Sequence, residues 1–304
     1  MGGCTNKSKS DSKPVEKHNP PTPNKLITPE HLPPVPPITE TIPDAELRQG
    51  KWYYKNGDVY EGEVKNNKPN GKGIYIDKSA GERYEGEIEN GSRHGCGVIV
   101  YNNGARAEGS FNRGFLHGPI KLKHQNYLLC ELTYNNGRSH GTLIGINGDK
   151  YEGDLFESNF DGKGIYTWKD NDKYEGDFKN SKFNGKGKIT FVNGGSFIGS
   201  FSNDKRYGRG IETAIITDAN DKKLTTVYDG NWKDSIKDGE GVMTRERVDG
   251  SIEVIRGTWK NSGLHGYCEI RVDGILFYKG FYQDGYAVNE SLASKCNDDS
   301  KKNI

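Results

Sequence analysis

The sequence predicts an all-β protein that is built from repeated β-hairpins, and three observations support this prediction. Glycine accounts for 41 of the 304 residues while only 32% of the chain is hydrophobic, which is too little for a thick two-layer core. Tyrosine occurs 17 times and methionine only twice, so strand-favouring residues are common and good helix formers are scarce. A tyrosine- and glycine-rich pattern also repeats along most of the chain. Together these observations exclude a helical bundle.

The chain before the repeats has a different composition. Ten of the twelve prolines lie before residue 44, including the run Pro33-Pro34-Val35-Pro36-Pro37. Such a stretch has almost no aromatic side chains and cannot bury enough apolar surface to fold. Residues 1–43 are therefore predicted to be a disordered, partly polyproline tether. Residues 44–49, which end at Gly50, are predicted to form a short helix that caps the sheet edge.

The repeat becomes clear when the first residue of each unit is counted as position 0. Glycine follows at position 2 in all units but one, a large apolar residue stands at position 4, and position 11 is glycine in all nine complete units. Five of these nine units are 23 residues long. The units begin at Tyr60, Tyr84, Ala107, Cys130, Tyr151, Tyr174, Phe197, Tyr228, Ile255 and Tyr278.

Each unit is predicted to be a β-hairpin with two different faces. Side chains alternate along a strand, so positions 0, 2 and 4 share one face with positions 13 and 15 of the second strand. Glycine opposite an aromatic ring leaves room for the ring to lie flat. On the other face, acidic positions 1 and 3 (Glu61, Glu63) are expected to pair with basic position 12 (Lys72). Dipeptides such as Asn70-Gly71 and Asn103-Gly104 are predicted to be the hairpin turns.

The pattern Y-x-G-x-Φ, with G-x-G beginning seven residues after the large apolar residue Φ, resembles the MORN repeat family over residues 50–286. Ile120 and Leu143 depart from it, because they replace the second glycine of G-x-G in the third and fourth units. The resemblance implies an elongated single-layer antiparallel sheet of about ten stacked hairpins. Residues 287–304 would form a C-terminal tail with a short capping helix. The best matches are Tyr60 to Gly73, Tyr84 to Gly97, Tyr151 to Gly164, Tyr174 to Gly187 and Tyr228 to Gly241.

The remaining chemistry-bearing residues indicate neither an active site nor a metal or cofactor site. The paired carboxylates recur in four units on a solvated face, whereas a catalytic pair is normally unique and sheltered. The five cysteines are scattered without a close pair. Four histidines share position 10, where successive units are spaced by roughly 10 Å, so they are predicted to be turn residues. They are His94, His117, His140 and His265.

The N-terminal sequence Met1-Gly2-Gly3-Cys4 resembles a lipidation signal. Gly2 is expected to carry a myristoyl group and Cys4 a palmitoyl group, since stable attachment to a membrane needs two acyl chains. No apolar run is long enough for a membrane-spanning helix, and no cleavable signal peptide is visible. The expected location is the cytoplasmic face of a membrane, with the plasma membrane or the cell cortex preferred.

These observations predict a non-enzymatic, membrane-anchored scaffold or adaptor of a eukaryotic cell. Its expected partners are the membrane and proteins, including cytoskeletal ones, and a homodimer is left open. A charge balance of 43 basic and 42 acidic residues argues against nucleic acid. Two alternatives remain: a module that binds phosphoinositide or other phospholipid headgroups, and a regulatory subunit of a lipid kinase or another enzyme. The partner site is predicted at two lengthened hairpins, Ile211 to Val227 and Arg245 to Gly250.

Overall fold

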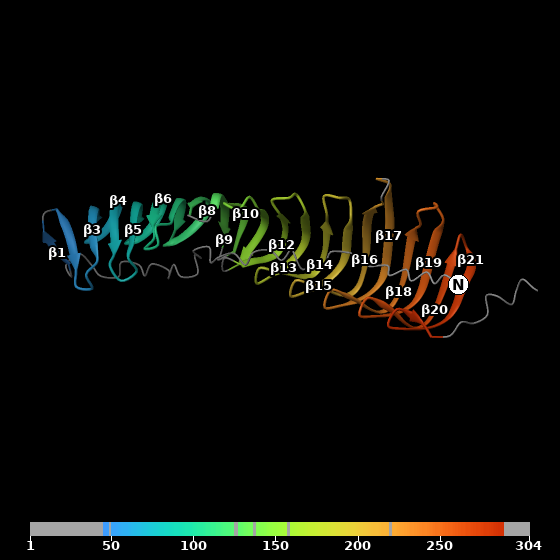
Figure 1. The fold of residues 1–304 in the computed structure, drawn as a ribbon. Helices are drawn as coiled ribbons and strands as arrows, with labels where there is room; N and C mark the ends of the chain where they lie inside the picture. The colour runs from blue at the N-terminus through green and yellow to red at the C-terminus, as the bar shows by residue number, and fades with distance from the viewer. Residues whose placement is uncertain are drawn as a thin grey trace, which may run out of the picture. The chain divides into compact units, whose positions relative to one another are not determined.

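The computed structural model describes residues 45–48, 50–124, 127–135, 138–156, 159–218 and 221–288. All regular structure in these residues is β-strand, and the strands belong to one antiparallel sheet (Figure 1). None of the described residues belongs to a helix that could cross a membrane. The predicted all-β, hairpin-repeat fold is thus confirmed. The tether predicted over residues 1–43 and the helix predicted in the C-terminal tail, Asn289 to Cys296, lie outside the described residues.

The described chain divides into two compact units. The first covers residues 45–170 and 177–182, the second residues 171–176 and 183–288, and β13 (Lys173–Lys179) contributes to both. The first unit holds β1 (Ala45–Arg48), β2 (Lys51–Tyr54), β3 (Val59–Lys65), β4 (Lys68–Asp77), β5 (Glu82–Glu89), β6 (Ser92–Val100), β7 (Arg106–Asn112), β8 (Phe115–Lys123), β9 (Tyr127–Asn135), β10 (Arg138–Gly145), β11 (Lys150–Phe156) and β12 (Asn159–Thr167). Except for Lys182, which belongs to the first, the second holds β14 (Lys182–Thr190), β15 (Ser196–Ser202), β16 (Lys205–Thr217), β17 (Lys223–Lys233), β18 (Ile236–Glu246), β19 (Ile252–Lys260), β20 (Gly263–Val272), β21 (Ile275–Gln283) and β22 (Tyr286–Ala287).

The segment before Gly50 corrects the prediction of a capping helix over residues 44–49. Ala45–Arg48 form strand β1, which pairs with β2 in register from Ala45 opposite Tyr54 to Arg48 opposite Lys51. The edge of β2 presents a row of unpaired N–H and C=O groups. A further strand forms hydrogen bonds with these groups, whereas a short helix does not. A helix of about six residues is also marginal by itself.

The hairpin turns are only partly where the asparagine-glycine pairs predicted them. Asn103-Gly104 does form a turn, in which the Gly104 N–H donates to the Tyr101 carbonyl at 2.9 Å. Asn70-Gly71 instead lies inside β4, where Gly71 has a φ of 106° next to a β-bulge. The actual turn is Asn66-Asn67, with φ values of 52° and 57°. Both features need a positive φ, so an Asn-Gly pair alone does not distinguish a turn from a bulge.

The inner face, which we define by the side chains at positions 0, 2, 4, 9, 13 and 15, holds the core. Its central element is an aromatic ring at position 0 that lies on two glycines, as predicted. Tyr174 is 0% exposed, and a Cβ atom added at Gly187 would lie 2.5 Å from its hydroxyl oxygen. The same hydroxyl position is fixed in other units by a donated hydrogen bond, for example from Tyr151 to the Asp154 carbonyl at 2.6 Å. Glycine is therefore needed to make space for the ring.

Where position 0 is aromatic, the rings of neighbouring repeats form an aromatic ladder, which is interrupted at Ala107, Cys130 and Ile255. Tyr174 stacks on Phe183, at position 9 of its own repeat, with ring centroids 3.7 Å apart. It is nearly perpendicular to Phe201, at position 4 of the next repeat, with ring centroids 5.3 Å apart and an interplanar angle of 88°. Tyr151 makes the same two contacts, with Phe160 at 3.6 Å and Phe178 at 5.3 Å. Each repeat thus completes the core of its neighbour, as expected for a repeat array.

A buried aspartate two residues before position 0 links the loop before its repeat to the second strand of that repeat and to the loop that follows it. Asp149 accepts hydrogen bonds from the Tyr166 hydroxyl at 2.8 Å and from the Lys169 N–H at 2.9 Å. Asp58 repeats this arrangement with the Tyr75 hydroxyl and the Lys78 N–H. These aspartates therefore have a structural role.

Candidate functional site

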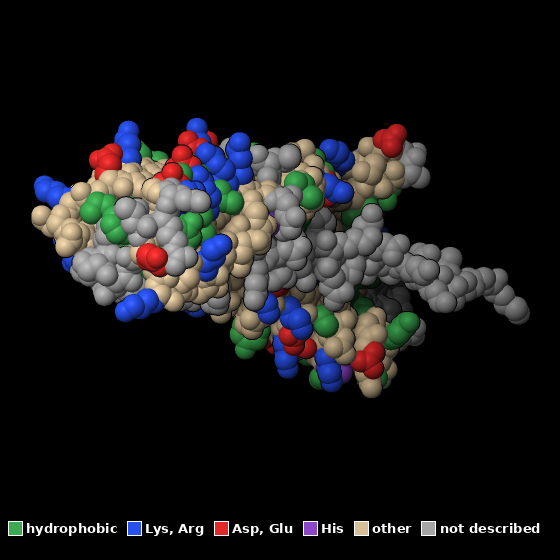
Figure 2. Space-filling model, turned by 90° about the vertical axis from the view of Figure 1, so that its left-hand side faces the viewer, with side chains coloured by type: hydrophobic (Ala, Val, Ile, Leu, Met, Phe, Trp, Pro, Cys, Tyr) green, Lys and Arg blue, Asp and Glu red, His purple; other side chains and the backbone are tan. Residues whose placement is uncertain are grey.

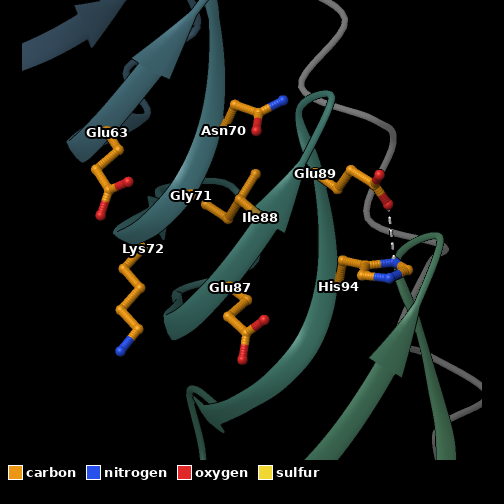
Figure 3. A pocket seen from close by; sticks show the side chains of 8 residues that line it. All are labelled: Glu63, Asn70, Gly71, Lys72, Glu87, Ile88, Glu89 and His94. Atoms are coloured by element: carbon orange, nitrogen blue, oxygen red, sulfur yellow. Dashed lines mark ion pairs between the residues drawn. The ribbon is translucent and has the colours of Figure 1, made fainter.

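The outer face, defined by the side chains at positions 1, 3, 10, 12 and 14, is the first candidate surface. A groove of about 540 Å³ crosses it between β3 and β6. Figure 3 shows Glu63, Lys72 and Glu87 pointing to the same side of the sheet, while Glu89 faces His94. The groove is lined by Glu63, Asn70, Gly71, Lys72, Glu87, Ile88, Glu89 and His94.

The acidic residues of this face hold the bulges of the sheet in place. One carboxylate oxygen of Glu87 accepts the Cys96 N–H at 3.2 Å, and Asp154 accepts the Lys163 N–H at the same distance. Both carboxylates lie across the glycine at position 11, where a side chain would collide: a Cβ at Gly95 would be 2.3 Å from the Glu87 carboxylate. In these repeats the acid at position 3 leaves no room for a side chain at position 11, and glycine there also has a positive φ, for example 55° at Gly95.

Ion pairs neutralise much of the outer face, as the sequence predicts. Lys163 at position 12 contacts Asp177 of the next repeat at 2.5 Å, and Arg209 contacts Asp229 at 3.1 Å. Basic and acidic side chains also lie close together over the surface seen in Figure 2. Exposed pairs of this kind contribute little to stability. The groove offers a mixed polar surface, and nothing in it is set apart as a nucleophile.

The histidines at position 10 lie inside strands rather than in turns, so that part of the prediction is wrong. His140 contacts the Asp154 carboxylate through Nδ1 at 2.8 Å, and His94 contacts Glu89 at 3.4 Å. In both cases the acidic residue lies on the neighbouring strand, so the histidine at position 10 forms a polar contact on the outer face. Within the described ranges, no group of three or more His, Cys, Asp or Glu side chains could hold a metal ion.

The inner face contains buried cations that the sequence analysis missed. At position 9, where other repeats have phenylalanine, Arg93 lies over the Tyr84 ring at 5.2 Å and pairs with Glu82 at 3.4 Å. Arg206 lies over the Phe197 ring at 4.6 Å and is bonded to Glu212. Aligning the repeats on position 9 would have found them, because this column holds Phe160 and Phe183 as well as arginine.

Lys237 joins the second of these clusters. It occupies position 9 of the next repeat, 4.9 Å from the Tyr228 ring centroid and 3.1 Å from a Glu212 oxygen. Burial alone would raise the pKa of Glu212, but the charges of Arg206 and Lys237 outweigh it and lower the pKa. At Glu82, which has a single arginine partner, burial prevails and the pKa is raised. Glu212 therefore stays ionised inside the core.

The two lengthened hairpins predicted in the seventh and eighth repeats are present and adjacent. The β16–β17 ladder continues to Thr217 opposite Lys223, and the β18–β19 ladder to Glu246 opposite Ile252. Thr226 pairs with Arg245, so the two extensions lie side by side. Figure 1 shows the β16–β17 hairpin reaching past its neighbours. Their apolar side chains are accessible: Ile216 is 57% exposed and Val248 is 64% exposed.

The outer face of the last full hairpin carries a second accessible apolar group. Tyr267 and Phe281 stand opposite each other, with ring centroids 5.4 Å apart and exposures of 49% and 56%. Lys279 lies 5.8 Å from the Tyr267 ring. Earlier repeats have charged or small residues in these columns.

Comparison with protein families decides the identity of the repeat. A family model described as the MORN repeat matches residues 60–79, 84–106, 151–173, 174–196, 197–214 and 228–246. The chain is a MORN-repeat protein. The matches begin at six of the ten repeat starts, and the unmatched stretch 107–150 contains Ile120 and Leu143 in place of glycine yet still forms strands β7 to β10. A comparison with curated proteins found no match.

MORN repeats are modules that interact with proteins and membranes, and they are generally non-catalytic. In the described residues, the outer face of these repeats is exposed to solvent. The predicted lipidation residues, Gly2 and Cys4, lie outside the described residues.

Proposed function

We propose that this MORN-repeat protein is a non-enzymatic scaffold that attaches to the cytoplasmic face of a membrane and presents its repeats to protein partners. Attachment is through a myristoyl group on Gly2 and a palmitoyl group on Cys4. The plasma membrane or the cell cortex of a eukaryotic cell is the proposed location. The proposal rests on the MORN repeats, which are interaction modules, together with the sequence Met1-Gly2-Gly3-Cys4.

The partner surface that we propose is the pair of extended hairpins. A single observation favours it: the extensions depart from the repeat and expose Ile216 and Val248 at their ends. Insertions in repeat proteins map to loops on one face, which is often the binding face. The regular outer face is instead covered by carboxylates and bases that already bond to one another or to the backbone.

Membrane attachment is tested with the full-length protein in cells. Gly2→Ala is expected to move the protein from the membrane fraction to the soluble fraction and to abolish labelling by an alkyne analogue of myristate. Cys4→Ser is expected to weaken retention, because a single acyl chain binds only marginally. Gly3→Ala is the matched control, since it leaves the acceptor glycine unchanged. If Gly2→Ala partitions like the wild type, the lipid anchor has no part in the function.

The partner surface is tested by proximity labelling with the intact protein. The double variant Ile216→Asp and Val248→Asp places charge on exposed positions and should leave the fold intact. It is expected to lose the proteins that the wild type labels. Val192→Asp is the control, because Val192 is 72% exposed in a loop of regular length. Equal labelling by both variants would move recognition elsewhere on the repeats. Binding to phosphoinositide vesicles is measured for the same variants. If the double variant loses vesicle binding while its protein labelling is unchanged, the lipid-binding alternative is favoured.

A further inference from the structure

The aromatic ladder is open at its first repeat. At Phe111, Phe178 and Phe201, the side chain at position 4 packs nearly perpendicular to the ring of the preceding repeat and is buried. Val64, at position 4 of the first repeat, is 40% exposed. Its counterparts in the next eight repeats are between 2% and 8% exposed: Ile88, Phe111, Tyr134, Leu155, Phe178, Phe201, Trp232 and Trp259.

The described strands explain why nothing covers Val64. Only β1 and β2 precede β3, and neither supplies a position-0 ring beside it. Leu47, Trp52 and Tyr60 lie in one row across these three strands. Val64 lies four residues further along β3 than this row. Strand β1 ends only one residue past the row, at Arg48, so it does not extend as far as Val64. The inner face at Val64 is therefore an apolar surface without a partner among the described residues.

We propose that residues 33–37 of the same chain, Pro33-Pro34-Val35-Pro36-Pro37, dock on this surface and close the ladder. The length of chain before β1 supports this occupant. Ala45 and Val64 are six residues apart along the strand direction and two strands apart, which is roughly 22 Å. Eight residue steps join Pro37 to Ala45 and span at most about 26–29 Å. The segment can therefore reach Val64, with little slack.

The chemistry of the segment fits a docking site on a sheet face. Proline has no backbone N–H, so a proline run can lie on an apolar surface without burying unpaired donors. A polyproline II segment is also pre-ordered, which is why aromatic and apolar surfaces bind such segments at low entropic cost. Five residues in this conformation extend about 12 Å. The separation of Val64 from the row of Tyr60 and Trp52 is similar, about 13 Å.

Docking would shorten the free part of the tether and hold the first repeat close to whatever the N-terminus binds. The proposal does not depend on acylation of Gly2, because it concerns only the contact between residues 33–37 and the inner face.

The first experiment places a photo-reactive benzoylphenylalanine at Val35 of the full-length protein. Irradiation is expected to give cross-links within one chain, from residue 35 to residues around Val64. The same probe at Val15 is the control, which should give no preferred product. Covalent dimers would show that the surface takes a second copy, and cross-links scattered along the chain would show that the segment does not dock; either result overturns the proposal.

The second experiment measures amide hydrogen exchange in the β3–β4 hairpin of the full-length protein. Replacing Pro33, Pro34, Pro36 and Pro37 with serine is expected to accelerate exchange near Val64 roughly ten-fold, because the covered end would open locally. Replacing Pro20, Pro21 and Pro23 with serine is the matched control and should leave exchange unchanged. All these positions precede the first described strand, so the repeats should remain folded. Unaltered exchange in the first variant would overturn the proposal.

Discussion

Replacing Gly187 with alanine tests whether the glycines exist to seat the rings. The backbone of Gly187 is not in the left-handed region, so alanine is conformationally permitted. Its Cβ would lie 2.5 Å from the Tyr174 hydroxyl oxygen and 2.6 and 2.7 Å from two ring carbons. The ring cannot move away, because Phe183 stacks on it at 3.7 Å and Phe201 meets its edge.

The expected cost follows from two opposing effects. Overpacking a tight core costs roughly 1–3 kcal/mol, and a contact this short with a trapped ring belongs at the upper end. Glycine-to-alanine replacement also restricts the unfolded chain, which returns about 0.4–1 kcal/mol. We therefore expect a net loss of about 2 kcal/mol in the free energy of unfolding. Urea unfolding of the full-length protein measures it, and amide exchange in β14 and β15 locates it.

Two further variants separate steric conflict from a general effect of the substitution. Gly263→Ala meets its nearest neighbour at 3.5 Å, an ordinary contact, and should be neutral or slightly stabilising. In a Tyr174→Leu background the ring is absent, so Gly187→Ala should then cost less than about 0.5 kcal/mol. If Gly187→Ala is as stable as the wild type, or equally harmful in both backgrounds, the ring does not lie on the glycine as described.

The remaining predictions concern buried polar groups. Glu212→Gln is expected to lower the free energy of unfolding by about 3 kcal/mol at neutral pH, because Arg206 and Lys237 would stay buried without a counter-charge; an unchanged urea midpoint would contradict this. Since the pKa of Glu212 is lowered on folding, its contribution is present above the unfolded pKa of about 4.3 and is lost as the pH falls through the lower folded value. As the pH is lowered through that range, the urea midpoint should fall more for the wild type than for Glu212→Gln. Parallel curves of midpoint against pH would disprove the assignment. Asp149→Ala should cost about 2 kcal/mol, since it leaves the Tyr166 hydroxyl and a backbone N–H without their acceptor; Tyr166→Phe should cost less, and the reverse order by thermal unfolding would refute this role.

The sequence was sufficient for the hairpin repeat and for the packing of rings on glycines. Tyr174 and Gly187 recur at fixed positions, so their spacing carries both the strand alternation and the contact. It did not separate turns from bulges, because Asn70-Gly71 supplies a positive φ that either feature accepts. Nor did it place Ala45–Arg48 in a strand, because the pairing partner that orders this segment is tertiary and its local sequence is compatible with a helix.

The candidate surfaces were predictable to different degrees. The lengthened hairpins followed from residue counting, because an insertion such as Ile211 to Val227 changes the interval between repeats. Arg93 and Arg206 were missed since a charged side chain is normally expected at the surface. Their burial depends on a ring beneath each guanidinium and a carboxylate beside it. These partners are several residues away in the sequence, so a local pattern does not reveal them.

The column at position 9 has a consequence for redesign of the array. A flat guanidinium there fills the same slot as a phenylalanine ring, but the two are not interchangeable one residue at a time. Arg206 is accompanied by Glu212, which stands at position 15 where Tyr166 and Ile189 are apolar in other repeats. Replacing Phe183 with arginine would bury an unpaired charge unless an acidic residue were introduced with it. At this repeat the smallest exchangeable part is thus a pair of residues, at positions 9 and 15 of strand β16.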